Sequence, residues 1–262
     1  FSPWSGDPIT SYLGWAFYRF SQWSFPIGLN PNYGMEVSSS IIFSDSIPLA
    51  AVLFKLVSFA LPVPFQFLGL WTALCFLMQS FIGWKLAHFI SKNWLFCTMA
   101  TLILTLAPPF LHRVNTHIAL SSQFVILIAL YLYFKRDSKR HFFYWGLLLC
   151  FTLTVHLYLF LMIGGIWVAD LLSNCPKIDS KILKIYVAKA GAIVIISAAL
   201  AWVLGYLQVN DISLSGGGYG AFKLNLLSLF DSNGWSYLLP DISTPFDFKE
   251  GFNYLGAGLI FL

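Results

Sequence analysis

The sequence predicts an all-α polytopic membrane protein, a helical bundle with long extracytoplasmic loops and juxtamembrane helices. Of its 262 residues, 58% are hydrophobic and 10% are charged, whereas soluble domains contain about 25% charged residues. The mean hydropathy is +0.75, and several apolar runs reach the roughly 20 residues that cross a bilayer as a helix. A soluble chain of this size buries only about three quarters of its surface. The composition therefore excludes a soluble enzyme, a disordered protein and a nucleic-acid binder.

Four apolar runs predict transmembrane helices, over 65–87, 94–111, 118–134 and 185–207. The run 142–172 has no charge before Asp170 and is too long for one ordinary span but short for two. Val155-His156 near its middle and Gly164-Gly165 could allow a tight hairpin, which we expect to turn at His156. The segment 47–63 is short, contains a lysine and has a proline near each end. These features favour a re-entrant or juxtamembrane helix over a crossing helix.

The basic residues predict the orientation. If 142–172 is a hairpin, ten of the fifteen Lys and Arg residues lie on one face, which the positive-inside rule assigns to the cytoplasm. The opposite face receives eight of the eleven acidic residues. We therefore expect five regions, with both chain ends truncated. They are a first extracytoplasmic loop at 1–46, a re-entrant or juxtamembrane helix at 47–63, a transmembrane bundle at 64–207, a second long loop at 208–253 and the start of another span at 254–262.

Three single residues on the predicted extracytoplasmic face each have a structural and a functional interpretation. Asp7, between Gly6 and Pro8, is either an exposed or helix-capping residue or a general base held at the membrane surface. Asp45 either caps the helix that starts near Pro48 or takes part in a polar site. His156 interrupts an apolar run, so it either makes a structural hydrogen bond or faces a polar cavity.

A predicted loop at 112–117 contains His112, Arg113 and His117. These side chains either reach the membrane surface as interfacial residues or hold an anionic headgroup, for which arginine offers bidentate contacts. The candidates near the last apolar run are Glu250, Asn253 and Tyr254. Since no Asp-x-Asp pair occurs anywhere, a metal-diphosphate site is not supported, and we expect no metal and no other cofactor.

Longer motifs carry a resemblance to a known group of proteins. The motifs are Gly6-Asp7-Pro8, the run 25–34 (FPIGLNPNYG), the run 44–49 (SDSIPL), Asn233-Gly234-Trp235-Ser236 and the run 250–256 (EGFNYLG). Together they resemble an uncharacterised family of bacterial multi-pass membrane proteins in the GT-C glycosyltransferase superfamily. That superfamily includes protein mannosyltransferases, aminoarabinose transferases and oligosaccharyltransferases.

The resemblance implies a GT-C-like bundle in the bacterial inner membrane, with an active site that faces the periplasm. The implied donor is a sugar on a polyprenyl phosphate, transferred with inversion to a hydroxyl of a glycan, lipid or protein; membrane lipids are expected partners and nucleic acid is not. GT-C enzymes carry a catalytic acid soon after the first span, a position that Asp7 matches. The donor- and substrate-binding residues would then be Arg113, His117, His112, Asp45, His156, Glu250, Asn253 and Tyr254.

Two other functions fit the sequence. A non-catalytic membrane subunit could dock a partner through the aromatic loops, in which case Asp7, Arg113 and Glu250 need not converge. A lipid-linked sugar transporter would need charged or helix-breaking residues near the middle of the bilayer. Apart from His156, the predicted spans carry their charges near their ends.

Overall fold

The computed structural model describes residues 7–34, 39–136, 140–176, 180–207, 226–242 and 252–261. The described part is mostly helical, and this confirms the predicted helical class. Within these residues, three helical segments are long and apolar enough to cross a membrane, namely Leu68–Ile90, Trp94–Thr116 and Lys181–Leu204. All three overlap predicted spans.

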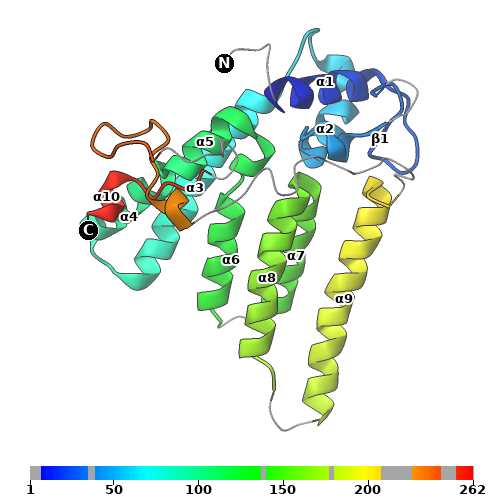
Figure 1. Cartoon of the computed structure of the whole chain (residues 1–262). Helices are drawn as coiled ribbons and strands as arrows, with labels where there is room; N and C mark the ends of the chain where they lie inside the picture. Colours follow the sequence, from blue (N-terminus) through cyan, green and yellow to red (C-terminus); the bar gives the residue numbers. More distant parts are fainter. Residues whose placement is uncertain are drawn as a thin grey trace.

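Seven helices form the bundle: α3 (Leu68–Ile90), α4 (Trp94–Thr105), α5 (Pro108–Thr116), α6 (Phe124–Phe134), α7 (His141–Val155), α8 (Leu157–Ser173) and α9 (Ser180–Leu204). Helix α7 packs against both α8 and α9, while α6 packs against α3 and α8. Figure 1 shows α6 to α9 running alongside one another, with α3 and α4 inclined to one side. The buried core includes Trp71, Phe124, Trp145, Leu149 and Ile163. Burying these large apolar side chains stabilises the bundle.

The structure divides the long apolar run 142–172 into two helices at His156. This residue is extended, with φ −163° and ψ 135°, and it ends α7 and begins α8. Its Nδ1 accepts a hydrogen bond from the backbone N–H of Tyr158 at 3.1 Å, which caps the start of α8. A helix pair that turns at His156 is the arrangement that the sequence predicts.

Two expectations about the bundle need correction. The segment 112–117 is not a loop, because Pro108 and Pro109 start a new helix, α5, which continues to Thr116. Proline suits the first turn of a helix, where its missing N–H is not needed. The predicted span 118–134 is also shorter than expected. A 3₁₀ turn, η4 (Ala119–Ser121), precedes α6, and the apolar segment Ala119–Phe134 falls below the length of the three candidate spans.

Helix α1 (Asp7–Phe20) lies across one end of the bundle, next to α2 (Pro48–Leu56) (Figure 1). Two buried side chains of α1 bind the segment that follows α2. Trp15 Nε1 donates to the carbonyl of Phe65, and the Arg19 guanidinium donates to the carbonyls of three residues between 58 and 62. These bonds fix α1 against the 3₁₀ helix η3 (Ser58–Ala60) and the chain after it.

Helix α2 has nine residues and is therefore about 14 Å long, less than half of the roughly 30 Å hydrocarbon core. The expectation that 47–63 does not cross the membrane as a single helix agrees with this length. The shorter elements are β1 (Leu29–Asn30), β2 (Ser39–Ser40), η2 (Ile41–Phe43), η5 (Leu226–Leu229) and α10 (Ala257–Ile260). Strands β1 and β2 pair antiparallel, with Leu29 opposite Ser40.

Candidate functional site

A polar site lies at the end of the bundle that carries α1 and α2, which we call the Asp45 end. The turn between η2 and α2 holds Asp45 there. Ser44 Oγ and Ser46 Oγ are 2.8 Å apart, and Ser46 Oγ donates to the carbonyl of Ser11 in α1 at 2.7 Å. Asp45 and Ile47 both have φ +51°, a left-handed conformation that is strained for a β-branched residue. The turn is thus held in place by its hydrogen bonds beneath α1.

Two histidines hold the carboxylate of Asp45. His156 Nε2 is 2.9 Å from Asp45 Oδ1, and His117 Nδ1 is 3.7 Å from Asp45 Oδ2. Because His156 Nδ1 accepts from the backbone of Tyr158, Nε2 is the nitrogen that carries the proton and donates to Asp45. The Asp45 side chain remains 26% exposed. The structure therefore brings together Asp45, His117 and His156, three of the predicted site residues, and leaves the carboxylate accessible.

The charges of the site follow from this geometry. Burial alone would raise the pKa of Asp45, but the contacts with His117 and His156 outweigh it and hold that pKa well below its usual range. Burial and the nearby charge of Asp45 raise the pKa of Tyr206 to about 12. Near neutral pH the site therefore presents an ionised carboxylate, with a neutral tyrosine hydroxyl in the same region. Such a carboxylate can accept hydrogen bonds from hydroxyl groups or stabilise positive charge that develops next to it.

Asp7 is the first residue of α1, although its side chain lies outside the described part of the structure. Its backbone is one helical turn before Ser11, whose carbonyl accepts the hydrogen bond from Ser46 beside Asp45. The start of α1 and Asp45 therefore belong to the same end of the bundle. Glu250 also lies outside the described residues.

The other residues of α5 and the late loop form a separate group. The His112 ring packs against Phe252 at a centroid distance of 4.9 Å and lies 6.1 Å from Trp235. Phe252 in turn contacts the buried ring of Tyr254 at 6.4 Å. His112 therefore joins the segment that contains Asn253 and Tyr254, whereas His117 faces Asp45. Arg113 is half-buried on the same helix.

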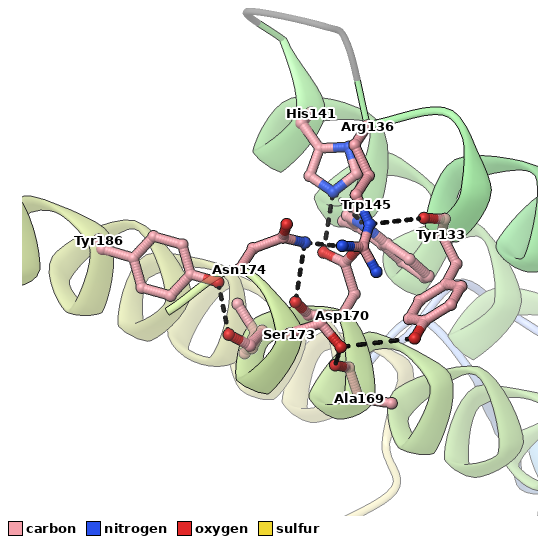
Figure 2. Close-up of polar contacts among 10 residues, drawn as sticks. Tyr133, Arg136, His141, Trp145, Ala169, Asp170, Ser173, Asn174 and Tyr186 are labelled. Carbon is pink, nitrogen blue, oxygen red and sulfur yellow. Dashed lines mark hydrogen bonds and ion pairs between the residues drawn. The ribbon is translucent and has the colours of Figure 1, made fainter. Parts of the chain in front are cut away.

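A second His–Asp pair lies at the opposite end of the α7–α8 hairpin, which we call the Asp170 end (Figure 2). His141 Nε2 is 2.8 Å from Asp170 Oδ2, and Trp145 Nε1 donates to the same histidine nitrogen at 3.0 Å. Asn174 Nδ2 donates to Asp170 Oδ1 at 3.1 Å. The Asp170 side chain is only 2% exposed. The pair is thus buried and connects α7 to α8.

A family model described as a domain of unknown function, DUF6311, matches residues 2–262. The chain belongs to this family. No curated protein and no solved structure matches it. The match spans almost the entire chain, so both ends of the bundle are parts of one DUF6311 domain.

Sequence reasoning missed several residues that shape the site of this DUF6311 domain. Ser44, Ser46 and Tyr206 position or border Asp45, yet none was among the predicted site residues. The signal for the two serines was present, because both flank Asp45 in the motif Ser44-Asp45-Ser46. Among the described residues, no group of three or more His, Cys, Asp or Glu side chains is arranged to hold a metal ion.

Proposed function

We propose that this DUF6311 domain is a GT-C-type glycosyltransferase of the bacterial inner membrane. It would move a sugar from a polyprenyl-phosphate-linked donor to an acceptor hydroxyl on the periplasmic face, with inversion. One observation carries the proposal: Asp45, an accessible anionic carboxylate, is held by His156 and His117 at one end of an apolar helical bundle. The sequence motifs that resemble GT-C enzymes support it.

The distribution of basic residues supports the proposed orientation. The connections at the Asp170 end, or the helix turns next to them, carry Lys92, Arg136, Arg140 and Lys181. By the positive-inside rule, this end would face the cytoplasm. The Asp45 end would then face the periplasm, where polyprenyl-linked sugars would meet their acceptors.

The proposed reaction is a single displacement. The acceptor hydroxyl oxygen attacks the anomeric carbon, its proton passes to the Asp7 carboxylate, and the bond from that carbon to the phosphate oxygen breaks, releasing the polyprenyl phosphate. Positive charge develops on the sugar ring in such a transition state, and ionised Asp45 would stabilise it. Arg113 would offset the negative charge on the leaving phosphate.

Asp45 and Asp7 would have different roles, charge stabilisation and proton acceptance, because their carboxylates would differ in proton affinity. A carboxylate whose pKa is well below its usual range is a weak base but a reliable anion near neutral pH. Asp45 fits the electrostatic role for this reason, because two histidines favour its charged form. Asp7 would serve as the general base.

The interior of α7 argues against the transporter alternative. Between His141 and His156 the helix carries no charged residue. Its buried side chains are apolar except for Thr152, whose hydroxyl donates to the carbonyl of Leu148 in the same helix. A transported head group would need polar partners near the middle of the membrane. Along α7, the two His–Asp pairs are therefore separated by apolar packing.

Native mass spectrometry of the full-length protein in mild detergent, with analysis of co-purified lipids, tests the donor class. Wild type and the Asp7→Asn and Arg113→Ala variants would be compared. We expect a polyprenyl phosphate or its glycoside in the wild type and the Asp7→Asn variant, and a loss of it in Arg113→Ala. Only bulk phospholipid in all three samples would overturn the proposal and favour a docking subunit.

A further inference from the structure

An apolar groove of about 620 Å³ runs between α8 and α9. Both helices pack against α7, and Leu149 and Leu153 of α7 line the groove between them. Small residues make room on both walls, with Gly164 on α8 and Ala198 and Ala201 on α9. The volume falls within the range of small-molecule pockets, about 300–1,000 Å³.

The groove has the length of one membrane leaflet. On α8 its lining extends from Leu157 to Val168, a distance of about 16 Å at 1.5 Å per residue. The hydrocarbon core of a bilayer is about 30 Å thick. A hydrocarbon chain that enters at the Asp45 end would therefore lie in the groove along roughly the whole of its own leaflet.

One end of the groove lies near the candidate site. Leu157, at the start of the lining, follows His156 directly. Tyr206 also lines the groove, and its hydroxyl donates to the carbonyl of Leu153 at 3.1 Å. The same tyrosine lies within the electrostatic reach of Asp45. Leu157 and Tyr206 thus place one end of the apolar groove next to the polar site.

We infer that the α8–α9 groove holds the hydrocarbon tail of the lipid-linked substrate, with its head group at the Asp45 end. This inference rests on the proposed function, because it assigns the tail of the donor to a place in the fold. A hydrocarbon tail bound there would take the place of membrane lipid and contact the apolar walls at Gly164, Ala198 and Ala201. Its head group would emerge between His156 and Tyr206.

Two neighbouring glycines provide a matched test. Gly164 lines the groove and Gly165 does not, and a Cβ added to either would meet no atom within 4 Å. The full-length protein in detergent would be exposed to a photoactivatable isoprenoid phosphate, and the cross-linked peptides mapped by mass spectrometry. We expect labelling on α8 and α9 in the wild type and in Gly165→Phe. Labelling of Gly164→Phe should fall at least about tenfold, because excluding two methylene groups from burial costs that much affinity.

A second pair of substitutions, on α9, keeps the test valid if Gly164→Phe fails to fold. Ala201→Phe also narrows the groove, whereas Gly191→Phe lies outside its lining, at a position with no atom within 4 Å of an added Cβ. Equal labelling of the filling variants and their controls would overturn the inference. So would equally strong labelling of the groove by a photoactivatable phospholipid, which would identify it as a site for bulk lipid.

Measuring labelling and sugar transfer separately distinguishes a failure of the groove assignment from a failure of the proposed reaction. Labelling does not require sugar transfer, so Asp7→Asn should be labelled as the wild type is. Specific labelling of the groove in a protein that transfers no sugar would support the lipid site and contradict the proposed function. Absence of labelling in a protein that does transfer sugar would contradict the groove assignment alone.

Discussion

Asp45 and His156 lie 111 positions apart in the sequence and are joined by a 2.9 Å hydrogen bond from Nε2 to Oδ1. The bond ties the first loop to the turn of the α7–α8 hairpin. The other nitrogen of the same ring caps α8 through the backbone of Tyr158. Both ring nitrogens of His156 therefore make hydrogen bonds. The position of the Asp45 carboxylate thus depends on how the helices of the bundle pack.

Replacing Asp45 by Asn should abolish most of the proposed transfer while the protein still folds. The substitution removes the negative charge and keeps the size of the side chain. Loss of one electrostatic contact to a transition state costs about 10²- to 10³-fold in rate, and we expect a decrease of that order in turnover. The measurement is sugar transfer per folded protein, with His156→Asn as a companion that retains a residue suited to helix capping. Full activity in Asp45→Asn would exclude the electrostatic role.

The contribution of Asp45 to stability should depend on pH. Its pKa is lower in the folded protein than the roughly 3.9 of an unfolded aspartate. The stabilisation is therefore present above that unfolded value and is lost as the pH falls through the folded pKa. The difference in melting temperature between wild type and Asp45→Asn should be largest near pH 7 and shrink below about pH 4. Thermal unfolding in detergent at pH 7, 5, 4 and 3 measures it, and a difference independent of pH would show that the carboxylate gains nothing from its histidines.

Gly14→Ala should disturb the site without changing any of its polar groups. A Cβ at this position would collide with the side chains of Ser44 and Ser46, which flank Asp45. Overpacking of this kind costs about 1–3 kcal/mol, and it should shift the Asp45 turn away from His156. We expect lower thermal stability and reduced transfer. Gly191→Ala, where an added Cβ meets no atom within 4 Å, is the control and should retain both properties.

Asp170→Ala should affect stability and not the reaction. The substitution removes the buried carboxylate that contacts His141 and Asn174. Leaving buried polar groups without their partner costs about 1–3 kcal/mol. Unfolding should therefore occur at a lower temperature, while turnover per folded protein remains at the wild-type level. A variant with normal stability and lost turnover would mean that the Asp170 end takes part in the chemistry.

The sequence predicted the helical class, and three of its four firm spans match helices long enough to cross a membrane, because long apolar runs leave few alternatives there. It also predicted the hairpin, since His156 interrupts the run 142–172 near its middle. The expected loop at 112–117 was wrong because Pro108 and Pro109 start a helix instead of ending one. The role of Asp7 and the GT-C relationship remain predictions.

The candidate site was predictable as separate residues and not as an arrangement. Asp45, His117 and His156 were each singled out, but each lies in a different segment, and only the packing of the bundle brings them together. Helix capping by Asp45 was the wrong alternative, since Ile47 precedes α2 without a side-chain cap. The His141–Asp170 pair went unnoticed because both residues stand at the edges of an apolar run, where charged groups are common.

The central claim is that the Asp45 end consumes a polyprenyl-linked sugar. The most direct measurement is the quantity of polyprenyl-phosphate glycosides in cells that lack the protein and are complemented with wild type, Asp45→Asn or Asp170→Asn. We predict that a glycosylated polyprenyl phosphate accumulates without the protein and with Asp45→Asn. Wild type should restore its low level, and so should Asp170→Asn when it is present at wild-type abundance. Unchanged amounts of every such lipid in all four strains would contradict the account.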